Sequence, residues 1–450
     1  MKKAISLILV LMMLFTVVAC NGSPAPSESP SSAAPSSAAP SAAAPSAEAS
    51  APSASGPAYP NCNPDGSINL DTIAHYDRDY DYTQNPVYKI AYMSHGPGAL
   101  YQQSADAYEH LAGLFNCEWA GYVTGNEDTS LFLSLLENQC DQGVNAFILD
   151  PDDTIFPSII AVIEKYPGVQ WMSMNATPRD NAVGDGIPPG GNMLNPSVGF
   201  NNYDAGVQCT KQLMEWKDAN FPDVPWDEVG FIAISFSIFT QLRQRAEGAW
   251  DIWCEEGPGT EANFFVADAV AGGINVQSGI DIITPILTTN TQYTHWLVMG
   301  NLDDLALGAA QVIDQMGYSD TSCVNTFGGS ALQMQWDAGQ QNAFRYALYA
   351  QQKLYGEPII GALYAFLNGW ATKDNIWPSW VRYDDHGIDG HTYSQLLVPT
   401  VWLDFDNYKH YLKWTDMYAL ANAYPEYPAE GISINDYSPF IDVPDYYHAP

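Results

Sequence analysis

Basic residues are scarce in this sequence. Lysine and arginine together number 16, against 51 aspartates and glutamates, and the formal net charge is −35 at pH 7. A field of this sign repels phosphate backbones and anionic membrane surfaces. The composition therefore argues against nucleic-acid binding, and its simplest consequence is a soluble acidic surface.

Motifs of the common enzyme classes are also missing. The chain contains no GxSxG, HExxH or P-loop pattern, no Cys/His pair has zinc spacing, and the eight histidines are scattered. Adjacent acids occur, but neighbours in sequence do not converge on a substrate as a catalytic acid and base must. These pairs are Asp152-Asp153, Asp303-Asp304 and Asp384-Asp385. We expect a protein that is not an enzyme and has no cofactor and no metal site.

The first 20 residues form a secretion leader. Two lysines precede an apolar run, Ala4–Val18, that is too short for a transmembrane helix. The run ends in Val-Val-Ala-Cys at 17–20, which resembles the lipobox of bacterial lipoproteins, although the family prefers leucine where Val17 stands. This resemblance implies that Cys20 carries a lipid and that the protein is anchored on the extracytoplasmic face of the cell membrane.

Residues 21–57 are a Ser/Ala/Pro tract with no apolar period. Such a composition cannot bury a core, so we expect a disordered tether between the anchor and the folded part. Six cysteines follow Cys20, and outside the cytoplasm they permit up to three disulfides. Cys117–Cys140 is the first candidate pair, because both residues lie near the same end of the first predicted sheet.

Short apolar runs alternate with helical patterns from Tyr88 onward, and the rhythm restarts near Val229. Strands that are apolar on both faces and separated by helices are typical of parallel sheets covered on both sides. We therefore predict an α/β fold of two doubly wound parallel-sheet lobes joined by a hinge. In such sheets the ligand crevice lies beyond the carboxyl ends of the strands, which here are rich in Asn, Asp and Ser.

Five segments in order carry a family resemblance. They are KIAYMSHGPGALYQQSADAYEHLAG (89–113), QGVNAFILDPDD (142–153), GFNNYDAGVQCTKQL (199–213), RAEG (245–248) and LDDLALGAAQVIDQMG (302–317). Their order and spacing resemble the type I periplasmic solute-binding proteins, the ribose- and galactose-binding-like group that serves ABC importers. The resemblance covers about 87–410.

The expected organisation follows from the leader, the tract and this resemblance. It comprises the signal peptide 1–20, the tether 21–57, an N-terminal extension 58–86, lobe 1 at 87–204 completed by about 341–368, lobe 2 at 205–340 completed by about 396–406, and a C-terminal tail 407–450, with a Trp- and acid-rich insertion at 369–395.

The resemblance also implies ligand-binding residues. Tyr101 matches an aromatic ring that stacks on a sugar face, Asp150 and Asn175 match polar positions after strands, and Arg245 matches an arginine that binds ring or hydroxyl oxygens. Four further positions match the pattern more loosely. They are Asn301, Asp303, Trp336 and Gln340.

Two departures from the family pattern argue against assuming ribose or galactose. The usual Asn-Asp pair becomes Leu302-Asp303, with Asn301 one position early, and Gly328 stands where a ligand-binding aspartate is common. Trp336 and Gln340 also follow sooner than in ribose-type members. Several alternative explanations of the polar residues stay open. Asp150 and Asn175 also suit turn caps, Asp303 suits the start of any helix, and Tyr101 and Trp336 suit ordinary packing.

The segment TQLRQRAEGAW (240–250) holds two of the six arginines. We expect Thr240 to cap a helix there. On a helix Arg243 and Arg245 lie about 200° apart, so they cannot readily share a target. Arg245 shares a flank with Gly248, where the backbone can approach closely, and the resemblance selects it for the ligand; Arg243 is expected to form a surface ion pair.

The resemblance implies a lipid-anchored, monomeric solute-binding protein that closes on a small polar ligand, most simply a sugar, and delivers it to ABC permease subunits. A ligand sensor of the same fold that presents the solute to a membrane receptor or histidine kinase is the alternative. A secreted glycosidase and a purely structural surface protein are more remote.

Overall fold

The protein is described by a computed structural model. It describes residues 59–97, 99–184, 187, 191–350, 352–379, 391–398 and 400–409. The leader with Cys20, the tether 21–57, the middle of the insertion 369–395 and nearly all of the tail 407–450 lie outside these residues.

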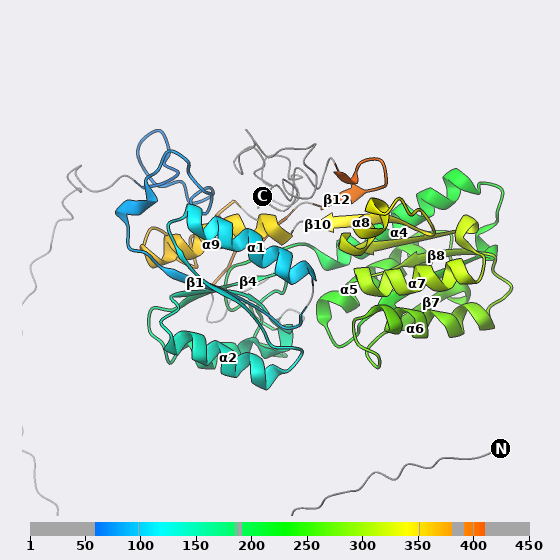
Figure 1. Ribbon diagram of the computed structural model, residues 1–450, viewed down its shortest axis with the longest axis horizontal. Helices are drawn as coiled ribbons and strands as arrows, with labels where there is room; N and C mark the ends of the chain where they lie inside the picture. The colour runs from blue at the N-terminus through cyan, green and yellow to red at the C-terminus, as the bar shows by residue number, and fades with distance from the viewer. Residues whose placement is uncertain are drawn as a thin grey trace, which may run out of the picture. The chain divides into compact units, whose positions relative to one another are not determined.

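The described residues form two six-stranded sheets, one in each lobe (Figure 1). All neighbouring strands in the first sheet are parallel. Its strands, in spatial order, are β11 (Gln395–Leu397), β5 (Ser197–Gly199), β4 (Gln170–Met174), β3 (Ala146–Asp150), β1 (Lys89–Ser94) and β2 (Glu118–Thr124).

The second sheet repeats this plan with one antiparallel edge strand, because β12 runs against β10. Its strands, in spatial order, are β12 (Thr400–Leu403), β10 (Phe344–Ala350), β9 (Ser322–Phe327), β8 (His295–Met299), β6 (Val229–Ser235) and β7 (Phe264–Asp268). The predicted architecture of two doubly wound parallel-sheet lobes is confirmed.

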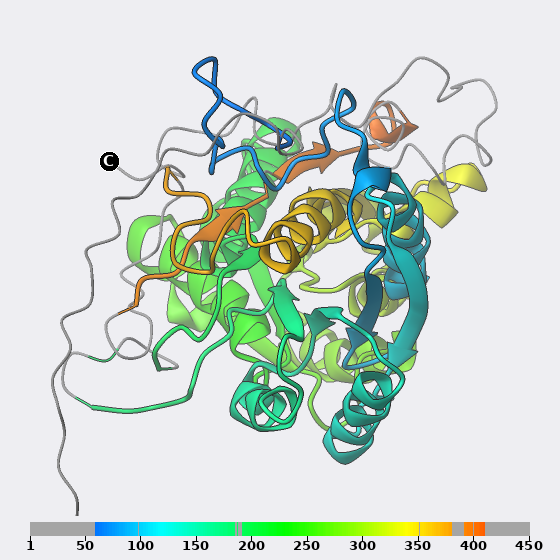
Figure 2. The same ribbon diagram turned by 90° about the vertical axis from the view of Figure 1, so that its left-hand side faces the viewer.

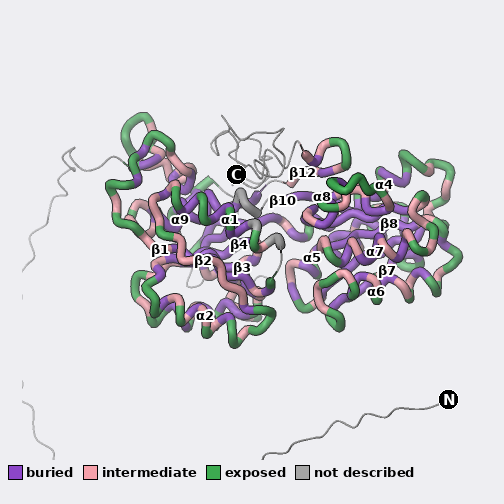
Figure 3. Tube along the Cα trace, in the orientation of Figure 1, coloured by how far each residue is buried: buried purple, intermediate pink, exposed green. Residues whose placement is uncertain are grey.

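Residues of the inner strands of both sheets are buried, and these strands are mostly purple in Figure 3. In β1, Ile90 and Tyr92 belong to one hydrophobic cluster and Ala91 and Met93 to another on the opposite face. Strand residues alternate between faces, so a strand covered on both sides must be apolar throughout. This explains why continuous apolar runs located the strands so closely.

Helices cover the sheets. In lobe 1, α1 packs against α9, and α2 packs against α3 on the other side (Figure 1). In lobe 2, α4 pairs with α5, and α6 pairs with α7. The helices are α1 (Ala99–Leu114), α2 (Thr129–Asp141), α3 (Phe156–Ile163), α4 (Asn202–Asn220), α5 (Thr240–Trp250), α6 (Val276–Thr289), α7 (Asp303–Gln315), α8 (Ser330–Asp337) and α9 (Gln352–Leu367).

Short helical turns connect several of these elements. They are the 3₁₀ turns Tyr82–Gln84, Asp153–Ile155, Trp226–Glu228, Glu261–Asn263 and Ser319–Thr321, and the π-helical turn Asp251–Glu256 that continues α5.

The chain changes lobes near its end in a way that the expected boundaries missed. Strand β10, within the stretch 341–368 that we expected to complete lobe 1, joins the second sheet, and only α9 covers lobe 1. The apolar stretch 396–406, expected to complete lobe 2, is divided. Strand β11 extends the first sheet and β12 the second. This single apolar run therefore contains two strands, and the sequence pattern does not show where one ends and the next begins.

The N-terminal extension packs on lobe 1 beside α9, as the blue and gold segments of Figures 1 and 2 show. Gly361 of α9 lies so close to Ala74 that a Cβ there would sit 1.8 Å from the Ala74 carbonyl oxygen. The buried Glu357 accepts a hydrogen bond from the Tyr76 N–H at 3.1 Å. Trp377 from the insertion is fully buried and donates its backbone N–H to Leu70. Extension and insertion thus pack on each other.

All six cysteines that the structure describes are free thiols. The disulfides that the even count permits are thus not formed among the described residues, and the first candidate pair, Cys117–Cys140, is not bonded. Cys140, at the end of α2, is buried in the core on one face of the lobe 1 sheet. Cys117 packs with the core on the opposite face of that sheet. The sheet separates the two thiols.

Two glycines let α4 and α5 approach each other closely. A Cβ on Gly206 would lie 1.9 Å from the carbonyl oxygen of Arg245, and a Cβ on Gly248 would lie 2.3 Å from that of Tyr203. Neither distance is possible for a real side chain, so both helices need glycine at the crossing. The predicted close approach at Gly248 is confirmed, and α4 is its partner.

We expect Gly206→Ala to lower the free energy of unfolding by about 1–3 kcal/mol or more, because the methyl group forces the helices apart. Urea denaturation measures this loss. Gly113→Ala is the matched control, since Gly113 is an exposed position in α1 with no atom near its Cβ. That variant should gain up to about 1 kcal/mol from helix propensity. Equal stability of the two variants would contradict the crossing argument.

Candidate functional site

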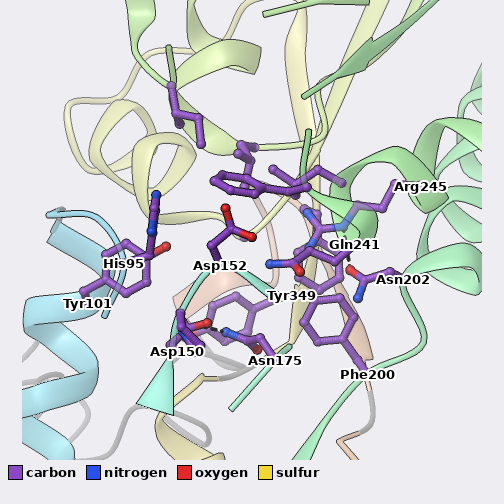
Figure 4. Close-up of a pocket in the computed structure, with 17 residues that line it drawn as sticks. His95, Tyr101, Asp150, Asp152, Asn175, Phe200, Asn202, Gln241, Arg245 and Tyr349 are labelled. Atoms are coloured by element: carbon purple, nitrogen blue, oxygen red, sulfur yellow. Dashed lines mark hydrogen bonds between the residues drawn. The ribbon is translucent and has the colours of Figure 1, made fainter. Parts of the chain in front are cut away.

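A cavity lies where the carboxyl ends of strands from both sheets meet. It encloses about 810 Å³, open solvent at its mouth included. Ligand pockets typically occupy about 300–1,000 Å³. Its lining residues, ten of which are labelled in Figure 4, are His95, Tyr101, Asp150, Pro151, Asp152, Asn175, Phe200, Asn202, Phe239, Gln241, Leu242, Arg245, Ile274, Leu302, Phe327, Gly328 and Tyr349.

Lobe 1 supplies a carboxylate and an amide that are joined by a hydrogen bond. Asp150 ends β3, and Asn175 follows β4 in a left-handed conformation, φ 62°, that asparagine tolerates well. The Asn175 amide donates to Asp150 at 3.2 Å, drawn as a dashed line in Figure 4. The Asn175 Oδ1 is buried and has no hydrogen-bond partner in the described structure. A buried oxygen without a donor marks a place for a ligand hydroxyl.

Burial dominates the electrostatics of this wall. Asp150 is 6% exposed, and its burial raises the pKa to about 7, although the hydrogen bond from Asn175 lowers it. Asp153, one turn beyond, has its pKa raised to about 6, again by burial. The pKa of the Tyr101 hydroxyl is raised by burial, so this ring carries no charge at neutral pH.

Lobe 2 supplies Arg245, which is 5% exposed. Its Nε donates to the Asn202 side chain at 3.0 Å, and its Nη1 donates to the Asn301 carbonyl at 2.7 Å and Asn301 Oδ1 at 3.3 Å. The guanidinium also lies over the Phe327 ring, 4.1 Å from its centroid, and 5.2 Å from that of Phe200. These contacts fix both the position and the plane of the group.

Arginine has five N–H donors. The contacts to Asn202 and Asn301 use those on Nε and Nη1, and the two on Nη2 have no partner among the described residues. Burial lowers the pKa of Arg245 to about 10, so the group stays charged at neutral pH. A fixed, charged donor pair remains for a ligand oxygen.

Aromatic rings form much of the remaining lining. Phe200 and Phe327 stack on each other with centroids 4.2 Å apart, and His95 of lobe 1 meets Phe239 of lobe 2 edge-on at 5.3 Å. Tyr349, labelled in Figure 4, also lines the cavity. Such faces cover the C–H side of a sugar ring or any other flat apolar surface.

Four of the eight residues expected at the site line this cavity: Tyr101, Asp150, Asn175 and Arg245. Asn301 lies just behind the lining. It is 2% exposed, adopts φ 60°, and donates to the carbonyls of Ile234 and Leu242. Since it also accepts from Arg245, Asn301 holds that arginine in place from behind.

Asp303 turns away from the cavity. Its carboxylate accepts hydrogen bonds from the Gly329 and Ser330 N–H groups at 2.8 Å and from the Ser330 hydroxyl at 2.7 Å. It thereby anchors the loop before α8. A Cβ on Gly328 would sit 2.9 Å from this carboxylate, and Gly328 adopts φ 127°. A side chain at position 328 would therefore collide with the Asp303 carboxylate.

Trp336 and Gln340 also lie outside the lining. Trp336 is 4% exposed and packs in the lobe 2 core, with its ring 4.9 Å from that of Tyr408. Gln340 is exposed just after α8. The structure thus does not bring Trp336 and Gln340, which matched the family pattern only loosely, to the cavity.

Thr240 begins α5 but does not cap it. The cap residue is Phe239, which makes no side-chain cap bond, and Thr240 shares a cavity wall with Asp153 of lobe 1. Arg243 pairs with Glu247 at 3.1 Å, with both side chains about half exposed, as expected for a surface ion pair. This is the usual i,i+4 arrangement on a helix.

Several lining residues were not singled out from the sequence. His95, Asp152 and Gly328 do stand at the strand ends where a crevice was expected, so their positions carried a signal. The sequence contains no such signal for Phe200 and Tyr349, because an aromatic residue at a strand end resembles a core residue. Nothing in the sequence singled out Asn202 either. Among the described residues there is no group of three or more His, Cys, Asp or Glu side chains that could hold a metal ion.

The fold defines a class. The two lobes have the fold of the type I periplasmic solute-binding proteins, as solved structures show over 72–77% of this chain. No protein-family model and no curated protein sequence matches the chain.

Three similar structures illustrate the likeness. An ABC transporter periplasmic solute-binding protein from Actinobacillus succinogenes with bound D-allose is 19% identical, with a TM-score of 0.53, over 72% of this chain and 100% of that chain. An arabinose ABC transporter binding protein from Shewanella is 13% identical, TM-score 0.55, over 75% and 98%. A 5-methylthioribose transporter binding protein from Thermotoga lettingae is 18% identical, TM-score 0.52, over 77% and 93%.

No helix in the part of the chain that the structure describes is both long enough and apolar enough to cross a membrane.

We expect the buried Asp150 to make stability depend on pH. Between about pH 4 and pH 7 the folded state holds a proton on Asp150 that the unfolded chain has released, so the free energy of unfolding falls as pH rises through this range. Asp150→Asn, which is neutral throughout, should flatten this slope and be more stable than the parent at pH 8. Urea denaturation at pH 5 and pH 8 measures both.

Asp320→Asn is the control, because Asp320 is an exposed carboxylate. It should leave the slope unchanged. A parent-like slope in Asp150→Asn would show that Asp150 ionises normally in the folded protein.

Proposed function

We propose that this protein captures a small, neutral, polyhydroxylated ligand, most simply a sugar, between its two lobes and delivers it to an ABC importer. The observation that carries the proposal is the pairing of unused donors and acceptors across the cavity. Arg245 offers two N–H groups from lobe 2, and Asn175 offers an unpaired buried oxygen from lobe 1. A hydroxyl can satisfy either group, because it both donates and accepts.

The walls support the same class of ligand. Aromatic rings surround these polar groups, which suits a ring that is apolar on its faces and polar at its edge. Asp150 and Asp152 also line the cavity, and they disfavour an anionic ligand. The solved proteins with this fold were found with D-allose, arabinofuranose, myo-inositol or 5-methylthioribose bound, all of them neutral polyols or sugars.

The proposal extends to the cell surface. The Val-Val-Ala-Cys sequence supports lipid attachment at Cys20, and the Ser/Ala/Pro tract supports a tether that lets the lobes reach permease subunits in the membrane. We also propose that the protein is a monomer and has no catalytic activity. The importer role rests on the fold of the neighbours and on this anchor.

A thermal-shift screen of the purified protein tests the ligand class. The panel contains neutral monosaccharides, disaccharides, polyols, sugar phosphates, nucleosides and amino acids. At least one neutral saccharide or polyol should raise the melting temperature, because binding to the folded state alone stabilises it. If only nucleosides or amino acids produce a shift, the sugar assignment is wrong.

Arg245→Lys should weaken binding of the ligand found in that screen by about tenfold or more. Lysine keeps the charge but loses the planar fork that contacts Asn202, Asn301 and the ligand together. Isothermal titration calorimetry measures the affinity. Arg243→Ala on the same helix should bind as the parent does, since its exposed pair with Glu247 stabilises little. Equal affinities in both variants would remove Arg245 from the site.

A further inference from the structure

A second cavity adjoins the first. It encloses about 540 Å³, open solvent included, and shares three residues with the first cavity: Asn175, Asn202 and Gln241. Both lobes contribute to it. Arg179 and Asn181 come from lobe 1, and Gln244 comes from the first turns of α5 in lobe 2. The two cavities therefore form one cleft with two compartments.

The compartments differ in chemistry. Phenylalanine and tyrosine rings with Leu242 and Ile274 line the first, which we call the aromatic compartment. Among the described residues that line the second, none is aromatic and every side chain is polar or charged, so we call it the polar compartment. A ligand that fills both has one part with apolar faces and another that is hydrophilic on all sides.

Polar groups on the shared wall and in the polar compartment lack partners. The buried Asn175 Oδ1 lies on the wall shared by both compartments without a hydrogen bond. The Gln244 amide, half-buried in α5, makes no side-chain hydrogen bond to the described residues. Buried polar groups are normally paired, so the Asn175 oxygen favours an occupant with hydroxyls, and the Gln244 amide is available to the same occupant.

The charges in the polar compartment balance. Its described lining residues include one carboxylate, Asp153, and one guanidinium, Arg179. In the orientation that gives the Gln241 amide its hydrogen bonds, this amide donates across the lobes to Asp153 at 3.1 Å. The Arg179 guanidinium donates to the Gly191 carbonyl at 2.6 Å. No net positive charge is left for a phosphate or a carboxylate, so the second part of the ligand is neutral.

We propose that the cleft binds a neutral disaccharide, with one ring in the aromatic compartment and the second ring in the polar compartment. This inference rests on the sugar-binding function proposed above and adds the size of the ligand. The bond between the rings passes the shared wall, where Asn175 and Asn202 contact both. Gln244 serves the second ring only.

Calorimetric titration of the purified protein tests this with matched sugars: glucose against maltose and cellobiose, galactose against lactose, and xylose against xylobiose. At least one disaccharide should bind about tenfold more tightly than its component monosaccharides. Gln244→Ala should weaken the affinity for that disaccharide by about three- to tenfold, the effect of one hydrogen bond. The affinity for the monosaccharide should not change. Glu247→Ala, on the exposed face of the same helix, is the control and should change neither affinity.

The outcomes separate the two proposals. Monosaccharide binding with no gain for any disaccharide overturns the two-ring ligand and leaves the sugar-binding function standing. An unchanged disaccharide affinity in Gln244→Ala, or an equal loss for both sugars, also overturns the assignment of the second ring to the polar compartment. Failure of every saccharide and polyol overturns the sugar-binding function and this inference with it.

Discussion

The crossing of α4 and α5 is the contact on which the rest of the site depends. Gly206 and Gly248 bring the two helix backbones together, and the residue that faces Gly206 is Arg245 itself. The crossing therefore sets where the Arg245 backbone lies, and Asn202 at the start of α4 then meets its side chain. Helix packing and ligand geometry are two aspects of one contact, because the same two helices supply both partners.

Burial explains why the fold could be predicted and part of the site could not. Strands covered on both faces have to be apolar throughout, so an apolar run such as 229–235 predicts the position of a strand. The helix dipole gives neither Arg243 nor Arg245 a local reason to stand in the first turns of α5, and Arg245 was selected by the family resemblance and by the flank it shares with Gly248. Asp303 was misplaced because a carboxylate at the start of a helix suits a ligand and a loop equally well, and only the path of residues 328–330 decides between them.

Contacts between distant segments left no trace in the sequence. Tyr349 and Phe200 reach the cavity from strands of different sheets, and neither differs from a core aromatic by its neighbours in the chain. The division of 395–403 between two sheets was equally hidden, since β11 and β12 read as one apolar run. The cysteines misled for a related reason. An even count permits disulfides, but burial on opposite faces of a sheet prevents Cys117 and Cys140 from meeting.

The chain crosses between the lobes several times, and these crossings have a mechanical consequence. The polypeptide passes between the lobes after β5, again between β10 and α9, and once more between β11 and β12. Several covalent connections at one boundary allow bending about a common axis but resist twisting and sliding of one lobe over the other. These connections thus restrict the relative orientations of the two lobes in the ligand-free protein. Little of the binding free energy is then needed to align the two halves of the cleft, and more remains for discrimination between ligands.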